Sequence, residues 1–398
     1  MYTNNNDKPT NNDKPKLNDE KVLCQAKKTL EIFLPLEADG YCVTSDTLYD
    51  ILIGIAANRG TTESVCAELA GAPDPETIRR YFREQFTVEQ LSDLQRSIND
   101  GLAANWPKKL RRGGPVEVAF DFHDRPYYGK QEQEKALWVR GEAKDGTTRF
   151  YRVATAYAIL HSQRVTLAIR FVLPGDQTVE VVKDLRQTLL LRALRVGVLY
   201  LDKGFSGVPV LKYLRRSKQA SLIACPIRGK KGGTRALCRG RASYGASHTF
   251  NEGKEDEFTA QLAVCRVFTT SRRTKRGKRR AEWLVFIMIA LDWTPERCRQ
   301  RYRKRFGVET SYRLGNKLLG WTTSPNAAYR FVLIGLGFLL LNLWVHLCWI
   351  YTQVAHRGRR AFAPFLFRQA RFINFLKHAL ESIYGTVNKI TAPAAAPS

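Results

Sequence analysis

The feature that most constrains the fold is an apolar run near the end of the chain. From Phe331 to Tyr351 there are 21 residues without Asp, Glu, Lys or Arg. A helix of that length can span a bilayer, and a helix that is apolar on all sides can also form the centre of a large core. Arg330 before the run and Arg357 after it give no charge asymmetry that would orient a span. The rest of the chain must therefore decide between a membrane span and a core helix.

The overall charge favours a polyanionic partner. The 398 residues include 64 Lys and Arg against 37 Asp and Glu, a formal net charge of +27. Nucleic acid is the partner that such an excess indicates first. With 44% hydrophobic residues, the composition excludes a disordered or fibrous chain. The eight cysteines form no Cys-x-x-Cys pair and no zinc-finger spacing with histidine, so they predict reduced, mostly buried thiols.

The first part of the chain predicts a polar tail followed by helices. In residues 1–20, Asn, Asp, Lys and Pro recur without the apolar stretch of a signal peptide, so we expect an unordered tail and a cytoplasmic, nucleoid-associated protein. Residues 21–112 carry apolar residues at helical spacing. Within them, Thr61 or Thr62 can cap one short helix, and Asp74 followed by Pro75 can begin a second after a Gly turn.

This pair of helices is a candidate helix-turn-helix motif. The second helix would carry Arg79, Arg80 and Arg83 outward and Ile78 and Phe82 inward, which favours contact with DNA. Two short helices around a Gly turn are also common as a packing module without DNA contacts. Both interpretations stay open at this point.

Residues 108–115 predict a linker, after which the pattern changes to strands. Strands are expected at 116–122, 155–161, 164–173, 196–201 and 220–226, with helices at 179–194 and 208–216. This order indicates a mixed sheet covered by helices. The Gly-rich, basic stretch at about 228–282 predicts an insertion rather than a continuation of the fold. A strand at 283–291, a long basic helix at 296–319 and a basic amphipathic helix at 365–384, inside a C-terminal region of 356–398, complete the chain.

Three acids stand out because each directly follows an apolar residue: Asp121, Asp202 and Glu309. Carboxylates that converge from strand ends and a helix suit hard ions such as Mg²⁺ or Mn²⁺, and two such ions can assist both oxygens of a phosphodiester displacement. With 37 acids in the chain, ordinary salt bridges at strand ends are the alternative. Asp124 competes for the first position, but we favour Asp121 because a turn is expected beyond it, at 125–126.

Three strings around these acids resemble the motifs of DDE transposases encoded by insertion sequences, in particular the IS-four-like group with its archaeal and bacterial relatives. The strings are Asp121-Phe122-His123-Asp124, Tyr200-Leu201-Asp202-Lys203-Gly204-Phe205 and Tyr302-x-x-Arg305-x-x-x-Glu309. In that family a Lys follows the Glu by seven residues, a position that Asn316 holds here, with Lys317 beside it. The resemblance covers roughly residues 116–350. It implies an α/β, RNase H-like catalytic domain over 116–355, with a mixed sheet flanked by helices, a β-rich basic insertion and a separate N-terminal helical domain.

The resemblance also implies an activity. Asp121, Asp202 and Glu309 would hold two Mg²⁺ or Mn²⁺ ions. Hydrolysis at a transposon end would free a 3′-hydroxyl, which would then attack target DNA. The run Phe331 to Tyr351 would pack inside the catalytic domain, so no membrane is expected. The partners would be double-stranded transposon ends and target DNA, bound by a homodimer.

Basic side chains near the acids are expected to contact DNA. Tyr302 and Arg305 share the helix face of Glu309 and can reach the phosphate beside the ions, and Lys317 is assigned to the same surface. A run of cations predicts backbone contact without sequence recognition: Arg272, Arg273, Lys275, Arg276, Lys278, Arg279 and Arg280. Two alternatives stay open, a catalytically inactive DNA-binding relic of a transposase and a basic protein with one membrane span.

Overall fold

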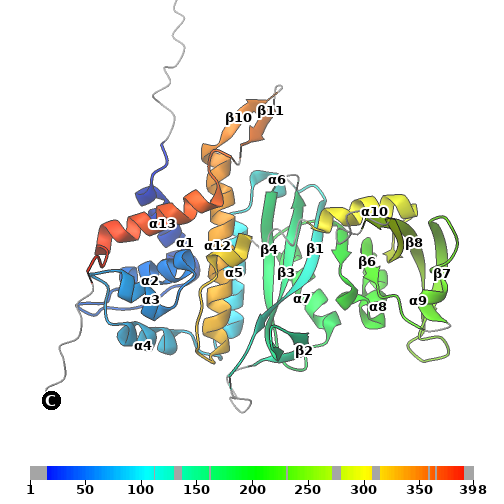
Figure 1. Cartoon of the computed structure of the whole chain (residues 1–398), viewed down its shortest axis with the longest axis horizontal. Helices are drawn as coiled ribbons and strands as arrows, with labels where there is room; N and C mark the ends of the chain where they lie inside the picture. The colour runs from blue at the N-terminus through cyan, green and yellow to red at the C-terminus, as the bar shows by residue number, and fades with distance from the viewer. Residues whose placement is uncertain are drawn as a thin grey trace, which may run out of the picture.

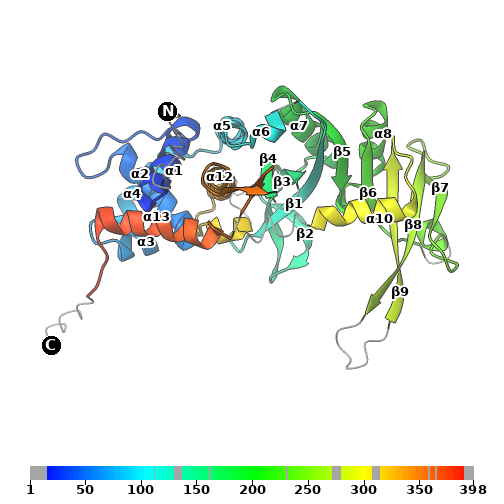
Figure 2. The same ribbon diagram turned by 90° about the horizontal axis from the view of Figure 1, so that it is seen from above.

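The computed structural model describes residues 16–111, 113–129, 137–160, 163–229, 232–270, 279–306, 314–356, 359–363 and 365–389. Three parts lie side by side in Figures 1 and 2: a group of helices, a long central helix and a wide sheet. The central helix separates the other two, and the candidate acids belong to the sheet.

The sheet is mixed, as its expected strand order indicates. Its order is β2-β3-β1-β5-β6-β9-β8-β7, and β4 also pairs with β3. The central pairs β1–β5 and β5–β6 are parallel, and the other pairs are antiparallel. The strands are β1 (Val116–Pro126), β2 (Val139–Lys144), β3 (Thr147–Leu160), β4 (Gln163–Val172), β5 (Val196–Leu201), β6 (Ser221–Cys225), β7 (Tyr244–Phe250), β8 (Phe258–Thr270) and β9 (Arg279–Ile289).

Helices cover both faces of this sheet. Helices α7 (Thr178–Leu191) and α8 (Val208–Arg216) lie on one face, and α10 (Pro295–Arg303) crosses the other, as the view from above shows (Figure 2). The expected strand at 196–201 and the expected helix at 208–216 are confirmed with the same bounds. Both were well defined in the sequence, because the apolar strand ends at an acid and the helix begins next to Pro209.

Two expectations about the order of elements are wrong. The segment expected as an insertion at about 228–282 continues the sheet, because its strands β8 and β7 add to β9, the expected strand at 283–291, which pairs with β6. The helix expected at 296–319 is not continuous: α10 ends at Arg303 and is followed by the 3₁₀ turn η3 (Lys304–Phe306), and among the described residues further on, 314–315 are again α-helical before the 3₁₀ turn η4 (Asn316–Leu318).

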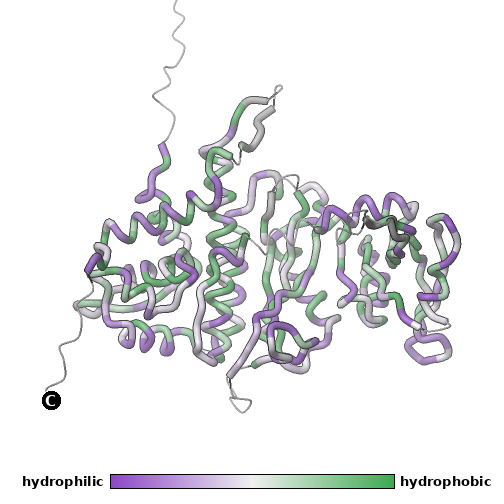
Figure 3. The backbone as a smooth tube through the Cα atoms, in the orientation of Figure 1, coloured by the Kyte–Doolittle hydropathy of each residue, from purple (hydrophilic) through white to green (hydrophobic). Residues whose placement is uncertain are grey.

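The apolar run forms α12 (Ala327–Tyr351), which is a core helix. Among the described residues, it is the helix long and apolar enough to cross a membrane, and 94% of its most apolar window is buried inside the protein. In Figure 3 this largely hydrophobic helix stands between the helical group and the sheet. Gly335 permits close approach of α5 (Leu91–Ala104), since a Cβ there would lie 2.6 Å from a methyl of Ile98. The expectation of a core helix is therefore confirmed.

Polar residues in α12 and α5 complete the edge of the sheet. Strand β4 pairs with β3 on one side only within the described residues. On its other side, Asn342 of α12 accepts a hydrogen bond from Thr166 N at 3.0 Å and donates one to Thr166 O at 2.8 Å. Asn99 of α5 makes the same two bonds with Ile169, at 2.8 and 2.9 Å. These side chains replace a neighbouring strand, so the buried edge keeps its hydrogen bonds.

The N-terminal helices and the C-terminal helix form one group. The helices are α1 (Asp19–Phe33), α2 (Ser45–Asn58), α3 (Thr62–Glu68), α4 (Pro75–Gln85) and α13 (Gln369–Tyr384), with the short α6 (Lys108–Arg111) leading to the sheet. Figure 1 shows α13 lying across α1 and α2. The hydroxyl of Tyr384 donates to buried Asp50 of α2 at 3.0 Å, and Lys27 of α1 pairs with the same carboxylate at 2.9 Å. The remaining short elements are α9 (Gly233–Ala236) and the hairpin β10 (Gln353–His356) and β11 (Arg359–Phe362).

Candidate active site

Two of the three candidate acids lie side by side at the end of the parallel strands. In the register of β1 and β5, Phe120 is opposite Leu201, so Asp121 and Asp202 follow at the same edge of the pair. The turn after β5 is fixed against β1, because the rings of Phe122 and Phe205 stack with centroids 4.4 Å apart. Asp202 also accepts a hydrogen bond from Lys203 N at 2.8 Å, which holds its carboxylate at the start of the turn. The strand register and these contacts therefore bring Asp121 and Asp202 together at the same edge of the sheet.

Arg305 bridges the two carboxylates. Its Nη2 lies 3.0 Å from Asp121 Oδ1 and 3.8 Å from Asp202 Oδ2. The Arg305 side chain is 10% exposed, that of Asp121 19% and that of Asp202 40%. Two carboxylates so close to each other repel unless a cation lies between them, and the guanidinium provides that cation here. Arg305 was expected to reach a phosphate, and in this structure it neutralises the acids.

Tyr302 supports the end of β5 from α10. Its hydroxyl donates a hydrogen bond to Leu201 O at 3.1 Å, and its ring packs against Phe286 of β9 with centroids 4.8 Å apart. Burial raises the pKa of Tyr302 well above its ordinary value, so the phenol keeps its proton and remains a donor. This contact fixes the residue directly before Asp202. The contact of Tyr302 with a phosphate stays a prediction.

Glu117 anchors α10 across β1 and was missed as a site residue in the sequence. Arg301 Nη1 lies 2.8 Å from Glu117 Oε1, and Lys304 Nζ lies 3.7 Å from Glu117 Oε2. Glu117 and Asp121 are four residues apart on one strand, so both point to the face that α10 covers. An acid in an otherwise apolar strand, in phase with Asp121, is the sequence signal that would have found it.

Asp124 belongs to a different environment. The turn expected at Arg125 and Pro126 is absent, because β1 continues to Pro126 and both residues pair with β3. Asp124 therefore lies on the strand, and its carboxylate forms a bidentate pair with Arg152 at 2.7 and 2.9 Å. Its odd offset from Asp121 puts it on the opposite face. The choice of Asp121 over Asp124 agrees with this geometry, although the reason given for it, a turn, is wrong.

The neighbouring histidine is buried and neutral. His123 lies between Asp121 and Asp124 in the sequence. Its ring packs edge-on against Phe338 of α12, with ring centroids 6.4 Å apart. Burial, with help from the charge of Arg125, lowers the pKa of His123 to about 3. The residue therefore carries no charge at neutral pH and contributes packing between β1 and α12.

Several predicted site residues cannot be placed. Glu309, Arg272, Arg273, Lys275 and Arg276 lie outside the described residues, as does Lys278. Arg279 and Arg280 begin β9, and only their backbone is described. Lys317 lies on η4 and is exposed, whereas Asn316 is half-buried. Asn316 occupies the position where the family motif has Lys. Of the two neighbours, Lys317 is the one whose side chain is exposed to solvent.

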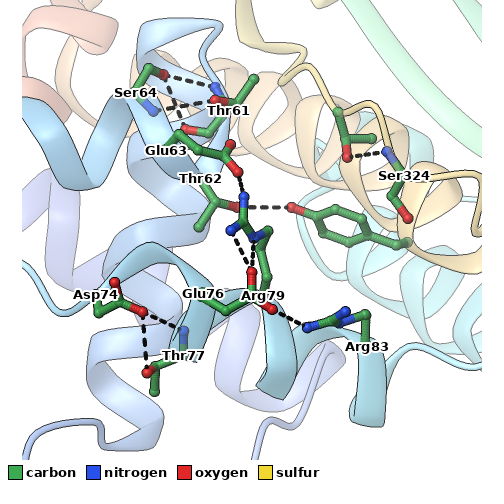
Figure 4. A network of polar contacts seen from close by, with 12 residues as sticks. Thr61, Thr62, Glu63, Ser64, Asp74, Glu76, Thr77, Arg79, Arg83 and Ser324 are labelled. Carbon is green, nitrogen blue, oxygen red and sulfur yellow. Dashed lines mark hydrogen bonds and ion pairs between the residues drawn. The ribbon is translucent and has the colours of Figure 1, made fainter.

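The candidate helix-turn-helix is present as two capped helices, with its basic face partly neutralised (Figure 4). Thr61 caps α3, and Asp74 caps α4 by accepting from Thr77 N at 3.0 Å. Ile78 and Phe82 point inward as expected, and Phe82 packs on Tyr329 of α12 with centroids 5.6 Å apart. Three pairs occupy the arginines: Arg79 with Glu63, Arg79 with Glu76, and Arg83 with Glu76. Arg80 is exposed, and its contact with DNA, like that of Arg79 and Arg83, stays a prediction.

The fold and the paired acids define a class of protein, an α/β fold with two neighbouring carboxylates at the ends of parallel strands. Comparison with known families then identifies the chain. Residues 112–343, more than half of the chain, match the transposase DDE domain family, so the chain belongs to that family. The comparison with curated proteins gave no match.

A solved structure gives the same fold. The chain is similar to piggyBac transposase in its synaptic complex with hairpin DNA, determined by electron cryomicroscopy, with a TM-score of 0.52 and 13% sequence identity. The likeness covers 91% of this chain and 80% of that one. The expected RNase H-like fold, a mixed sheet flanked by helices, is thereby confirmed.

Proposed function

We propose that this chain is a DNA transposase that cleaves phosphodiesters at the ends of a mobile element and joins the freed 3′-hydroxyl to target DNA. The observation that carries the proposal is the arrangement of Asp121 and Asp202 on adjacent parallel strands, both within reach of one cation-bearing side chain. Membership of the transposase DDE domain family supports the reaction class. The transposase of similar fold is seen in a complex with hairpin DNA, which supports DNA as the partner.

The acids fit a divalent cation. Asp121 and Asp202 offer carboxylate oxygens, the donors that Mg²⁺ and Mn²⁺ prefer, and the position of Arg305 shows that a positive charge is stabilised between them. Among the described residues no cluster of three or more His, Cys, Asp or Glu has the geometry of a metal site. We assign the third ligand to Glu309, four residues after Arg305 in the sequence. Two ions held there would activate the attacking oxygen and stabilise the leaving one.

The residues around Asp121 and Asp202 position these carboxylates and neutralise their charge. Tyr302 and the Phe122–Phe205 stack fix the strand ends that bear the carboxylates. The pairs of Arg301 and Lys304 with Glu117 hold α10, and with it Arg305, over β1. With a metal ion bound by these carboxylates, the guanidinium of Arg305 would be free to meet a phosphate oxygen, the role expected for it from the sequence. The IS-four-like group, the homodimer and the nucleoid-associated location stay predictions.

A cleavage assay tests this function. The substrate is double-stranded DNA that carries the ends of the element encoding this chain, with Mg²⁺ or Mn²⁺. We expect wild-type protein to release a 3′-hydroxyl, and Asp121→Ala, Asp202→Ala and Glu309→Ala to abolish the release. Asp145→Asn, an exposed acid in the turn between β2 and β3, is the matched control and should cleave normally. DNA binding without cleavage by the wild type, unchanged by the three substitutions, would favour the inactive relic.

A further inference from the structure

A second polar site lies beside the loop that leads into α12. The loop at residues 319–326 is held at three points: Trp321 N donates to Gly60 O at 2.8 Å, Tyr151 Oη donates to Pro325 O at 2.8 Å, and Arg330 Nε donates to Ser324 O at 2.6 Å. Under it is a pocket of about 40 Å³, room for a few water molecules or one small anion. Trp321 and Thr322 line both this pocket and a larger cavity of about 470 Å³ that reaches α3 and α4.

Two half-buried arginines line the small pocket. The guanidinium of Arg125 lies over the ring of Trp321 at 5.0 Å, and that of Arg330 lies over Tyr151 at 4.8 Å. Arg59, exposed at the end of α2, directly precedes Gly60, whose carbonyl holds the loop through Trp321 N, and its positive charge acts on Arg125. Trp321 is itself 48% exposed, so the pocket opens to solvent beside an aromatic face.

The positive charge of this cluster has no carboxylate counterpart. Within the described residues, no Asp or Glu lies within ion-pair distance of Arg59, Arg125 or Arg330, whereas the half-buried Arg152 and Arg170 each have such a partner. Burial and the neighbouring arginines lower the pKa of Arg125, and burial lowers that of Arg330. Cations taken partly out of water without an anion are costly, and the aromatic faces offset only part of that cost. An anion bound in the pocket would offset the cost of burying these unpaired positive charges.

We infer that Arg125, Arg330 and Arg59 form a phosphate-binding site that receives a phosphodiester of the bound DNA. Guanidinium groups bind phosphate through paired hydrogen bonds, and Trp321 offers a face on which an adjacent base stacks. Arg125 follows Asp121 by four residues on the same face of β1, about 13 Å along the strand, so this phosphate lies away from the cleaved one. The pocket and its arginines by themselves support the binding of a phosphate group. That this phosphate belongs to DNA rests on the proposed function.

Three substitutions test the site, with folding checked by circular dichroism and thermal unfolding. Arg125→Gln removes a half-buried cation, and Arg59→Gln removes an exposed one, so the second variant keeps the test usable where the first fails to fold. Arg371→Gln, an exposed arginine on α13, is the control of equal charge change. Each protein is titrated with a double-stranded oligonucleotide at several salt concentrations, and separately with inorganic phosphate by calorimetry.

In a plot of the logarithm of DNA affinity against the logarithm of salt concentration, we expect Arg125→Gln and Arg59→Gln to have shallower slopes than the wild type. The difference should be about 0.9, the contribution of one phosphate contact. Arg371→Gln should keep the wild-type slope. Phosphate binding that requires Arg125, without any change in the DNA slope, would overturn DNA as the source of the phosphate. Wild-type slopes and phosphate binding in both variants would overturn the site itself. The cleavage assay with Asp121→Ala tests the catalytic proposal, and the binding assay tests this phosphate site. Failure of one proposal can therefore be told apart from failure of the other.

Discussion

Replacing Arg305 with Gln is expected to destabilise the protein in the absence of divalent ions. The substitution leaves Asp121 and Asp202 as neighbouring carboxylates without the cation that now lies 3.0 and 3.8 Å away. Breaking a fully buried pair costs about 3–5 kcal/mol, and an exposed pair contributes about 0–1 kcal/mol. Because Arg305 is 10% exposed but Asp202 is 40% exposed, we expect an intermediate loss of about 2 kcal/mol.

The same substitution should strengthen the binding of Mg²⁺. In the wild type, an ion must displace the guanidinium before it reaches both carboxylates, and in Arg305→Gln it does not. If the whole 2 kcal/mol is recovered on binding, the dissociation constant for Mg²⁺ falls by up to about 30-fold.

Calorimetric unfolding with EDTA and across a Mg²⁺ titration measures both effects. The matched control is Arg303→Gln, which removes the same charge from an exposed position two residues away on α10. Equal stability of Arg305→Gln and wild type in EDTA, together with unchanged Mg²⁺ affinity, would refute the placement of Arg305 between the acids.

Three further variants test the core and its supports. Asn342→Leu leaves both backbone groups of Thr166 without partners and should lower the free energy of unfolding in urea by about 2–4 kcal/mol; no loss, or a gain, would fit a lipid-facing helix instead. Tyr302→Phe removes the hydrogen bond to Leu201 O and should cost about 1 kcal/mol in the same assay, and a change below the error of the measurement would contradict that contact. Burial lowers the pKa of His346 below its ordinary value of 6.5, so below that pH the unfolded chain takes up a proton that the folded chain refuses. Wild-type stability should therefore fall more steeply than that of His346→Leu between about pH 7 and pH 5, and parallel curves would argue against a half-buried, neutral imidazole.

The parts of the fold that follow from local pattern were predictable. The strand ending at Asp202 and the helix beginning near Pro209 have local signals, and their bounds agree with the structure. The core position of α12 followed from the family resemblance, since length alone fits a membrane span equally well. Asn342 within the run is explained by its hydrogen bonds to Thr166 of β4, which lies 176 residues earlier in the sequence.

The parts that depend on distant pairing were not predictable. Continuation of the sheet beyond β9 through β8 and β7 required knowing that the far edge of β9 is open. The bridge from Arg305 to Asp121 joins the turn η3, directly after α10, to β1, and no spacing in the sequence encodes it. The unpaired cluster around Arg125 arises because the loop at 319–326 packs against the end of β1. Each of these features is set by which surfaces meet after folding, whereas periodicity reports only which face of an element is apolar.

The most direct test of the central claim is a Mn²⁺ titration of wild type, Asp121→Asn, Asp202→Asn and Asp124→Asn, followed by calorimetry and by electron paramagnetic resonance of the free ion. Asp124 is the matched control, because it lies three residues from Asp121 on the same strand but pairs with Arg152 on the opposite face. We predict that Asp121→Asn and Asp202→Asn each lose Mn²⁺ binding and that Asp124→Asn retains it. Retained binding in the first two variants, or loss confined to Asp124→Asn, would contradict a cation site at the ends of β1 and β5.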